Sequence, residues 1–313
     1  MKRIAIFLLC VLAVLLLVDY FGGWPSSKQS EEVVVQRPER TLKADPIPAT
    51  HPRPEAVTPN AAPTQTRKSA PKASSEAPKA SQTPSGPLEI PVSNLGAEQI
   101  IAHVGFTLGY NSRTRLSNWV AYELTRNEVL GDEPRGKHFR TDPQARGVQA
   151  ANDDYRNSGW DKGHMCPAGD MKWSKQAMNE SFYFTNICPQ NRNLNRGDWK
   201  DLEELCRDLA SRYGNLYIVC GPVVGQAKNG RLGANAVTIP DGFYKALLAK
   251  TADGYTAIGF YFENAAGSRK LSYYARTIDQ IEAMTHIDLF PALPDAIEQS
   301  IESNFTLSHW GIN

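Results

Sequence analysis

The sequence predicts an α+β domain that follows a long non-globular segment. Short apolar runs bounded by Gly, Asp or Asn have the length and composition of strands, and they lie at 120–125, 216–220, 244–249 and 257–262. Apolar residues at helical spacing predict helices at 197–213, 278–284 and 294–304, the first of which should end at Gly214. Because strands and helices do not alternate regularly, we expect the α+β class.

Residues 1–24 resemble a targeting segment. Lys2 and Arg3 precede an apolar run from Ile4 to Val18, which fits a secretory signal or a signal-anchor. No small-residue cleavage pattern follows, so we favour an uncleaved transmembrane anchor that holds the rest of the chain outside the cytoplasm, periplasmic or extracellular. Secretion after cleavage is the alternative.

Residues 25–87 are rich in Pro, Ala, Ser, Thr, Lys and Glu and have no apolar period. Such a segment cannot bury enough apolar surface to offset its ordering entropy, so it predicts a disordered linker. We therefore expect the folded domain to comprise residues 88–313. The net charge is only +1, so attraction to a polyanion must come from a local basic patch.

Four cysteines lie in the predicted domain, at Cys166, Cys188, Cys206 and Cys220. In an oxidising compartment this even number permits two disulfides with three connectivities. Buried free thiols are the alternative, and the sequence leaves both open.

The segment from Trp160 to Arg207 carries the chemistry. Its candidate residues are one histidine, two amides, two acids and two cations, in the order Asp161, Lys162, His164, Asn186, Asn195, Glu203 and Arg207. A histidine suits deprotonation of water because its pKa lies near working pH. An amide oxygen is an acceptable ligand for Mg²⁺. This inventory fits the hydrolysis of a phosphodiester with a hard metal ion.

Two of these positions have structural alternatives. Asn195 is placed to cap the helix predicted at 197–213, because Asn is a favoured capping residue. Glu203 and Arg207 are four residues apart on that helix and therefore share a face, where a surface ion pair would contribute only a few tenths of a kcal/mol.

Three segments, Asp161–His164, Asn186–Gln190 and Asn195–Glu203, together resemble the DNA/RNA non-specific endonuclease family of Serratia-type and endonuclease G-like enzymes. The resemblance implies a ββα-metal (His-Me finger) fold on a central antiparallel sheet. It implies one Mg²⁺, replaceable by Mn²⁺, and cleavage of DNA and RNA with low sequence specificity. A nucleotide phosphodiesterase and a non-catalytic nucleic-acid-binding module are the alternatives. A homodimer is a further expected partner.

The same resemblance assigns roles to individual residues. His164 activates the attacking water, and Asn195 is the direct protein ligand of the metal. Glu203 holds a metal-bound water, while Arg207 contacts the phosphate or the leaving group. Asn186 positions the substrate and supports the site, and Asp161 belongs to the histidine motif.

One departure affects phosphate binding. The family's usual arginine before the Gly-His pair is Lys162 here, which keeps the charge and loses the two-donor fork. A second phosphate-binding cation is expected upstream. Lys137 is the nearest match by its position before Thr141-Asp142-Pro143, with Arg135 and Arg140 as close rivals.

Overall fold

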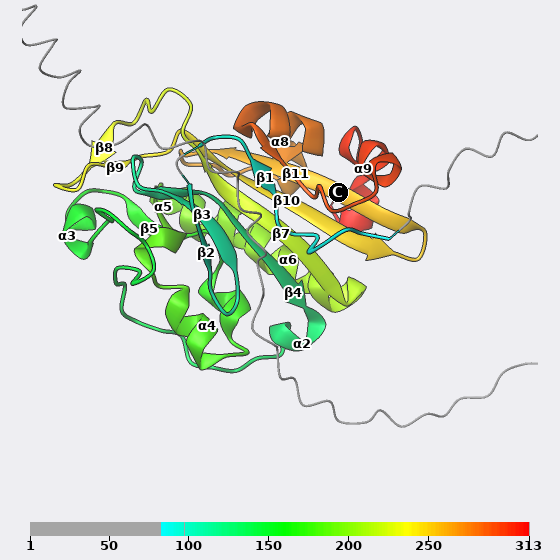
Figure 1. Ribbon diagram of the computed structural model, residues 1–313, viewed down its shortest axis with the longest axis horizontal. Coiled ribbons are helices and arrows are strands. Elements are labelled where there is room, and N and C mark those ends of the chain that lie inside the picture. The colour runs from blue at the N-terminus through cyan, green and yellow to red at the C-terminus, as the bar shows by residue number, and fades with distance from the viewer. Residues whose placement is uncertain (1–82, 97, 313) are drawn as a thin grey trace, which may run out of the picture. The chain divides into compact units, whose positions relative to one another are not determined.

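The computed structural model describes residues 83–96 and 98–312, which form a mixed α/β fold around one antiparallel sheet (Figure 1). The expected anchor at 1–24 and the linker up to residue 82 lie outside the described residues. The sheet has seven strands in the order β12-β11-β10-β7-β4-β3-β2. Their bounds are β2 Glu98–Ala102, β3 Thr107–Asn111, β4 Leu116–Thr125, β7 Asn215–Val223, β10 Gly242–Thr251, β11 Gly254–Glu263 and β12 Ala275–Arg276.

Three two-stranded ribbons accompany this sheet: β1 (Val92–Ser93) with β13 (Ile287–Asp288), β5 (Asp161–His164) with β6 (Ile187–Gln190), and β8 (Arg231–Leu232) with β9 (Val237–Thr238). The helices are α2 Arg126–Val129, α3 Asn152–Tyr155, α4 Lys175–Glu180, α5 Arg192–Arg196, α6 Asp198–Tyr213, α7 Leu271–Tyr274, α8 Ile278–Thr285 and α9 Asp295–Glu302. Short 3₁₀ turns lie at 168–171, 184–186 and 307–310.

The four predicted strands are present as the central strands β4, β7, β10 and β11. The three predicted helices correspond to α6, α8 and α9, and α6 ends at Gly214, whose φ of 93° suits glycine. All four cysteines of the described residues are buried and free, so the free-thiol alternative holds there.

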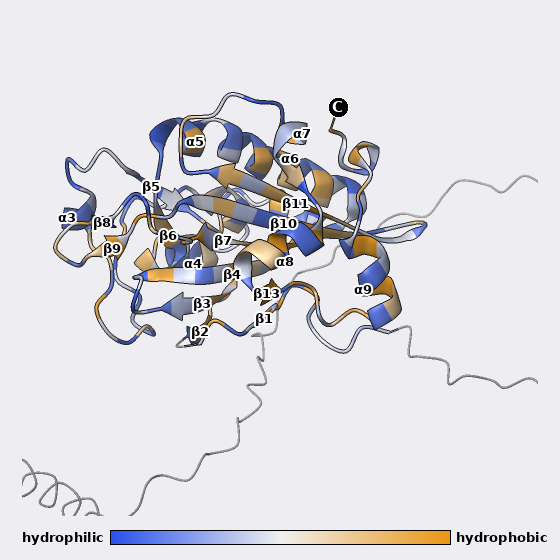
Figure 2. Cartoon of the chain, turned by 90° about the horizontal axis from the view of Figure 1, so that it is seen from above, coloured by the Kyte–Doolittle hydropathy of each residue, from blue (hydrophilic) through white to orange (hydrophobic). Residues whose placement is uncertain are grey.

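Helices cover both faces of the sheet. Figure 2 shows α6 on one side and α8 with α9 on the other. Side chains along a strand alternate between faces, so Phe243 and Leu247 of β10 pack in the α6 layer while Tyr244 and Leu248 pack in the α8 layer. This two-sided burial explains why β10 reads as a continuous apolar run rather than an alternating one.

The N-terminal edge of the domain is held by short contacts. The backbone N–H of Ser85 donates to the carbonyl of Ala292 over 2.8 Å, and Leu88 is buried in the α8 layer. Within the described residues, contacts with the domain therefore include positions before Leu88. Within the part of the chain that the structure describes, no helix is both long and apolar enough to cross a membrane.

Candidate active site

The β5–β6 ribbon positions the histidine. His164 pairs with Ile187 and Gly163 with Cys188 across an antiparallel ladder. A Cβ added at Gly163 would lie 2.0 Å from Oε1 of the buried Gln190, so only glycine allows the two strands this approach. The ribbon thereby delivers His164 to a cleft of about 330 Å³.

This cleft joins most of the residues that the sequence singled out. Its walls include His164, Lys162, Asn195, Glu203 and Arg207. Five basic residues and one acid line it, the basic ones being Arg135, Lys162, Arg196, Lys200 and Arg207. The local basic patch that the small net charge required is therefore present around the histidine.

His164 is buried between aromatic rings. Its imidazole centroid lies 5.0 Å from that of Phe182 and 5.5 Å from that of Phe139, and Nε2 has no hydrogen-bond partner among the described residues. Burial, with the positive charge of Arg135, lowers the pKa of His164 to about 3. The ring is therefore neutral at neutral pH, with one unprotonated ring nitrogen.

Asn195 does not cap the long helix. It lies in the last turn of α5, and the residue before α6 is Gly197. The cap of α5 is Asn191, whose Oδ1 accepts the backbone N–H groups of Asn193 and Leu194. A short separate helix that the sequence did not predict precedes α6, so the capping alternative for Asn195 is wrong.

Asp161 holds this short helix in place. Its carboxylate accepts from Nε of Arg196 at 2.8 Å and from Nδ2 of Asn195 at 3.2 Å, and Arg192 lies 3.5 Å away. Burial alone would raise the pKa of Asp161, but the hydrogen bonds from Arg196 and Asn195 lower it. The ionised carboxylate therefore engages the amide NH₂ of Asn195 and leaves the amide oxygen for another ligand.

Glu203 and Arg207 do not pair with each other in the expected way. Nη1 of Arg207 donates to Oδ1 of Asp170 over 2.8 Å, and the hydroxyl of Tyr122 donates to the other oxygen of this fully buried carboxylate. Glu203 is half-buried at the cleft, and burial raises its pKa to about 7 although Lys245 opposes the shift. Arg207 is therefore oriented by the buried carboxylate of Asp170, in place of the expected surface ion pair with Glu203.

Lys245 supplies positive charge beneath the site. It is fully buried on β10, with Nζ 4.6 Å from the centroid of Trp199, one turn before Glu203 on α6. Its charge lowers the pKa of both Glu203 and Asp170 against the effect of burial. Lys245 and Asp170 were not predicted from the sequence; the one available signal was a lone lysine inside the apolar run Phe243–Leu248.

Asn186 has no exposed surface. Its side chain accepts from the backbone N–H of Cys166 and donates to the carbonyls of Cys166 and Ser181. These bonds fasten the turn that follows His164, which matches the expected support of the site. No surface of Asn186 is available for the expected contact with substrate.

The cations are not equally placed. Lys162 lies in the cleft, where Nζ donates to Oδ1 of Asn152 over 2.8 Å and sits 4.8 Å from the ring centroid of Phe139. Of the upstream candidates only Arg135 lines the cleft, with its guanidinium 5.4 Å from the ring centroid of Phe182. The nearest match by motif position, Lys137, is therefore not the residue that reaches the cleft.

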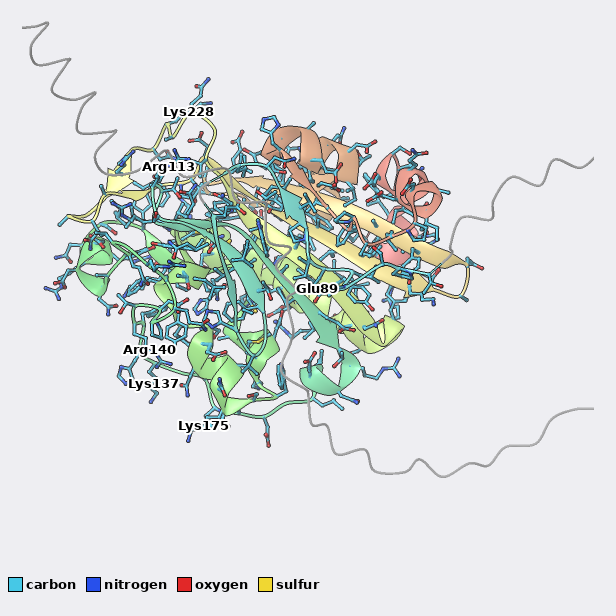
Figure 3. All side chains as sticks on the ribbon, in the orientation of Figure 1. Glu89, Arg113, Lys137, Arg140, Lys175 and Lys228 are labelled. Carbon is cyan, nitrogen blue, oxygen red and sulfur yellow. The ribbon has the colours of Figure 1, made fainter. Side chains whose placement is uncertain are left out.

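The two remaining upstream cations lie elsewhere on this edge. Figure 3 shows the side chains of Lys137 and Arg140 projecting outward near α4. Arg140 instead donates to the carbonyl of Asn179 and lies 4.8 Å from the ring centroid of Tyr183. In the loop between 131 and 140, Gly136 packs closely against Phe182, a contact that spacing within the sequence does not encode.

The sequence of this chain is similar to those of known proteins. The sequence model of the family described as DNA/RNA non-specific endonuclease matches residues 84–296. Mitochondrial nuclease EXOG of Xenopus laevis is 36% identical over 227 residues, which cover 66% of this chain and 62% of that protein. Human mitochondrial endonuclease G is 33% identical over 177 residues, covering 53% of this chain and 60% of that protein.

A bacterial relative and a solved structure extend the comparison. A nuclease of Nostoc is 31% identical over 213 residues, covering 63% of this chain and 75% of that protein. The crystal structure of the EndoG/EndoGI complex superposes with a TM-score of 0.60 at 26% identity, over 64% of this chain and 89% of that one. The chain thus spans about three fifths of the length of the mitochondrial relatives it matches.

Proposed function

Because this chain belongs to the DNA/RNA non-specific endonuclease family, we propose that it is a metal-dependent endonuclease acting on DNA and RNA. One observation carries the proposal: neutral His164, the amide of Asn195 and Glu203 share one basic cleft. The β5–β6 ribbon followed by α6 would then be the ββα-metal finger that the family resemblance implies.

The donor set fits one hard divalent ion such as Mg²⁺ or Mn²⁺. Asp161 holds the Asn195 amide nitrogen, so the amide oxygen is free to bind a cation, and Glu203 in the same cleft can hold a water on it. When bound, such an ion neutralises charge on phosphoryl oxygens and stabilises the departing oxygen. Few protein ligands suit Mg²⁺, which keeps most of its waters.

The side chains of this chain do the remaining work. A nitrogen of His164 takes a proton from the attacking water, and the surrounding Phe139 and Phe182 rings keep the imidazole in place. Arg135, Lys162 and Arg207 provide positive charge for the phosphate. Such contacts carry no base identity, which is consistent with low sequence specificity.

Replacing His164 by Ala tests this function. We expect plasmid DNA cleavage to fall by about 10²–10⁴-fold, because the general base is removed while the phosphate contacts remain. His309→Ala, at an exposed position outside the cleft, is the matched control and should cleave at the wild-type rate. Wild-type cleavage that persists in EDTA would contradict metal dependence, and His164→Ala activity within threefold of wild type would contradict the assigned base.

The N-terminal segment supports a second part of the proposal, that residues 1–24 tether the nuclease to a membrane with the domain extracytoplasmic. The support is the basic pair Lys2 and Arg3 followed by the apolar run to Val18. Fractionation of the full chain beside a chain starting at residue 83 tests it. Recovery of the full chain in the soluble extracytoplasmic fraction would instead favour cleavage and secretion.

A further inference from the structure

A second, larger hollow adjoins the candidate active site at α5. It has a volume of about 520 Å³, within the range of small-ligand pockets. Leu194 lines this hollow, whereas the next two residues of α5, Asn195 and Arg196, line the cleft with His164. Figure 2 shows α5, α6 and α7 along the same edge of the fold. The two hollows therefore lie on different faces of α5.

The lining of this hollow combines an exposed aromatic ring with cations. Tyr273 of α7 is 64% exposed, which is unusual for a large ring. The guanidinium carbon of Arg269 lies 5.6 Å from the ring centroid, and Nη1 of Arg276 donates to the carbonyl of Tyr273. Glu263 is the one acid in the lining. We call this hollow the Tyr273 pocket.

Hydrogen bonds fix the Tyr273 pocket relative to the candidate active site. The hydroxyl of Tyr274 and the backbone N–H of Arg269 both donate to Asp198, the first residue of α6. A Cβ added at Gly267 would lie 2.6 Å from both Asp198 and Tyr274, so the loop packs tightly on the helix start. The same helix carries Glu203 and Arg207, and the pocket is therefore preformed on the element that builds the site.

We propose that the Tyr273 pocket binds one unpaired nucleobase of a nucleic-acid strand whose scissile phosphate lies in the cleft. The ring of Tyr273 stacks on the base, and Arg269 and Arg276 face the neighbouring phosphates. Arg196 lines the cleft, and Arg192 on the same helix is equally exposed, so α5 adds positive charge beside the cleft. This inference rests on the proposed nuclease function and adds its substrate class.

The proposal predicts a preference for single strands. A base inside a duplex has both faces covered by its neighbours, so it must be unstacked before it can reach Tyr273. Single-stranded DNA or RNA and frayed ends present such bases without that cost. We expect single strands to be cleaved faster than intact duplexes.

The test compares oligothymidylates of increasing length, from dT2 to dT12, by kcat/KM at fixed salt. In the wild type kcat/KM rises once the strand is long enough to reach both hollows. Tyr273→Ala lowers the ratio of kcat/KM on dT12 to that on dT2 by about 5- to 100-fold, since stacking of one base on an aromatic ring has this size. Tyr273→Phe keeps the ring and retains the ratio.

Tyr255→Ala is the matched control. Tyr255 also lies beside a cation, with Nζ of Lys250 at 5.6 Å from its ring, but it sits at the opposite end of β11. The ten residues of β11 span roughly 30 Å, so this variant removes another tyrosine ring beside a cation, far from the pocket. Its ratio of kcat/KM on dT12 to that on dT2 remains that of the wild type.

A binding measurement distinguishes failure of this inference from failure of the nuclease proposal. Fluorescein-labelled dT12 is titrated in EDTA, where no turnover is needed. Weaker binding by Tyr273→Ala together with no cleavage by the wild type would support the pocket and overturn the nuclease function. If Tyr273→Ala and the wild type bind dT12 equally and have the same ratio of kcat/KM on dT12 to that on dT2, the proposed base-binding role of the Tyr273 pocket is wrong.

Discussion

At the scale of single residues, two neighbouring asparagines divide two tasks that the sequence assigned to one. Asn191 caps α5 through its side-chain oxygen, while Asn195 is held by Asp161 with its amide oxygen left for a cation. Helix capping and the proposed metal binding are therefore separable by mutation. Asn191 caps the five-residue helix that carries Asn195, so each variant is a control for the other.

Asn195→Ala should raise the Mg²⁺ concentration needed for half-maximal cleavage, because it removes the proposed protein ligand. Its melting temperature should change little, since the side chain caps no helix. Asn191→Ala should leave the Mg²⁺ titration unchanged. It should lose about 1 kcal/mol of stability, which is roughly 2–4 °C in melting temperature. Metal titrations and melting curves of both variants check this. An Asn195→Ala protein with an unchanged metal titration would exclude Asn195 as a ligand.

At the scale of elements, α8 and α9 meet through like charges. One carboxylate oxygen from each of Asp279, Glu282 and Glu302 lies within 4.8 Å of the others. Burial and the neighbouring acids raise the pKa of Glu302 to about 8, and burial raises that of Glu282 to about 7. The folded state therefore binds protons more tightly here than the unfolded chain does.

The raised pKa values of Glu282 and Glu302 make the packing of α8 and α9 depend on pH. A raised carboxyl pKa stabilises the fold fully below the unfolded value of about 4.3, and this stability is lost as pH rises through about 8. Glu302→Gln should therefore raise the melting temperature at pH 8 and flatten its fall between about pH 5 and pH 8.

Glu204→Gln is the control for this pH effect, because its pair with Lys200 lowers the pKa of Glu204 and gives the opposite sign. Melting curves at several pH values, recorded for both variants beside the wild type, check the prediction. A Glu302→Gln protein whose melting temperature follows the wild-type pH curve would show that the cluster is not coupled to folding.

At the scale of the whole molecule, the N-terminal edge closes the α8 layer. Leu88 is buried there beside Ile281 and Leu289, and β1 pairs with β13. Residues 83–94 thus belong to the domain although their sequence has no strong strand or helix pattern. Their contribution comes from contacts with residues about two hundred positions later in the chain, such as Ser85 with Ala292.

Two truncations test this edge. A chain starting at residue 83 should keep cleavage activity, because every cleft residue and every contact described here remains. A chain starting at residue 95 loses Leu88 and β1, which we expect to cost about 2–5 kcal/mol, or a fall of roughly 5–15 °C in melting temperature. Equal melting temperatures of the two truncated chains would show that residues 83–94 contribute no stability.

The sequence by itself determined the fold class, the four central strands and the composition of the candidate site. Strand and helix periodicity are local, and the motif residues from Asp161 to Arg207 lie within fifty positions, so short-range pattern sufficed. Reliance on local pattern also explains why the capping alternative for Asn195 and the choice of Lys137 were wrong. A five-residue helix and an irregular loop are too short to show a period of apolar residues.

Only the tertiary structure decided which distant groups meet. Asp170 reaches Arg207 across 37 positions, Lys245 arrives beneath Glu203 from β10, and Arg135 rather than Lys137 enters the cleft. Burial sets the charge states of His164 and Glu203, and burial is a property of the packed sheet and helices. Sequence spacing carries no information about these long-range contacts, which are the physical source of the site's electrostatics.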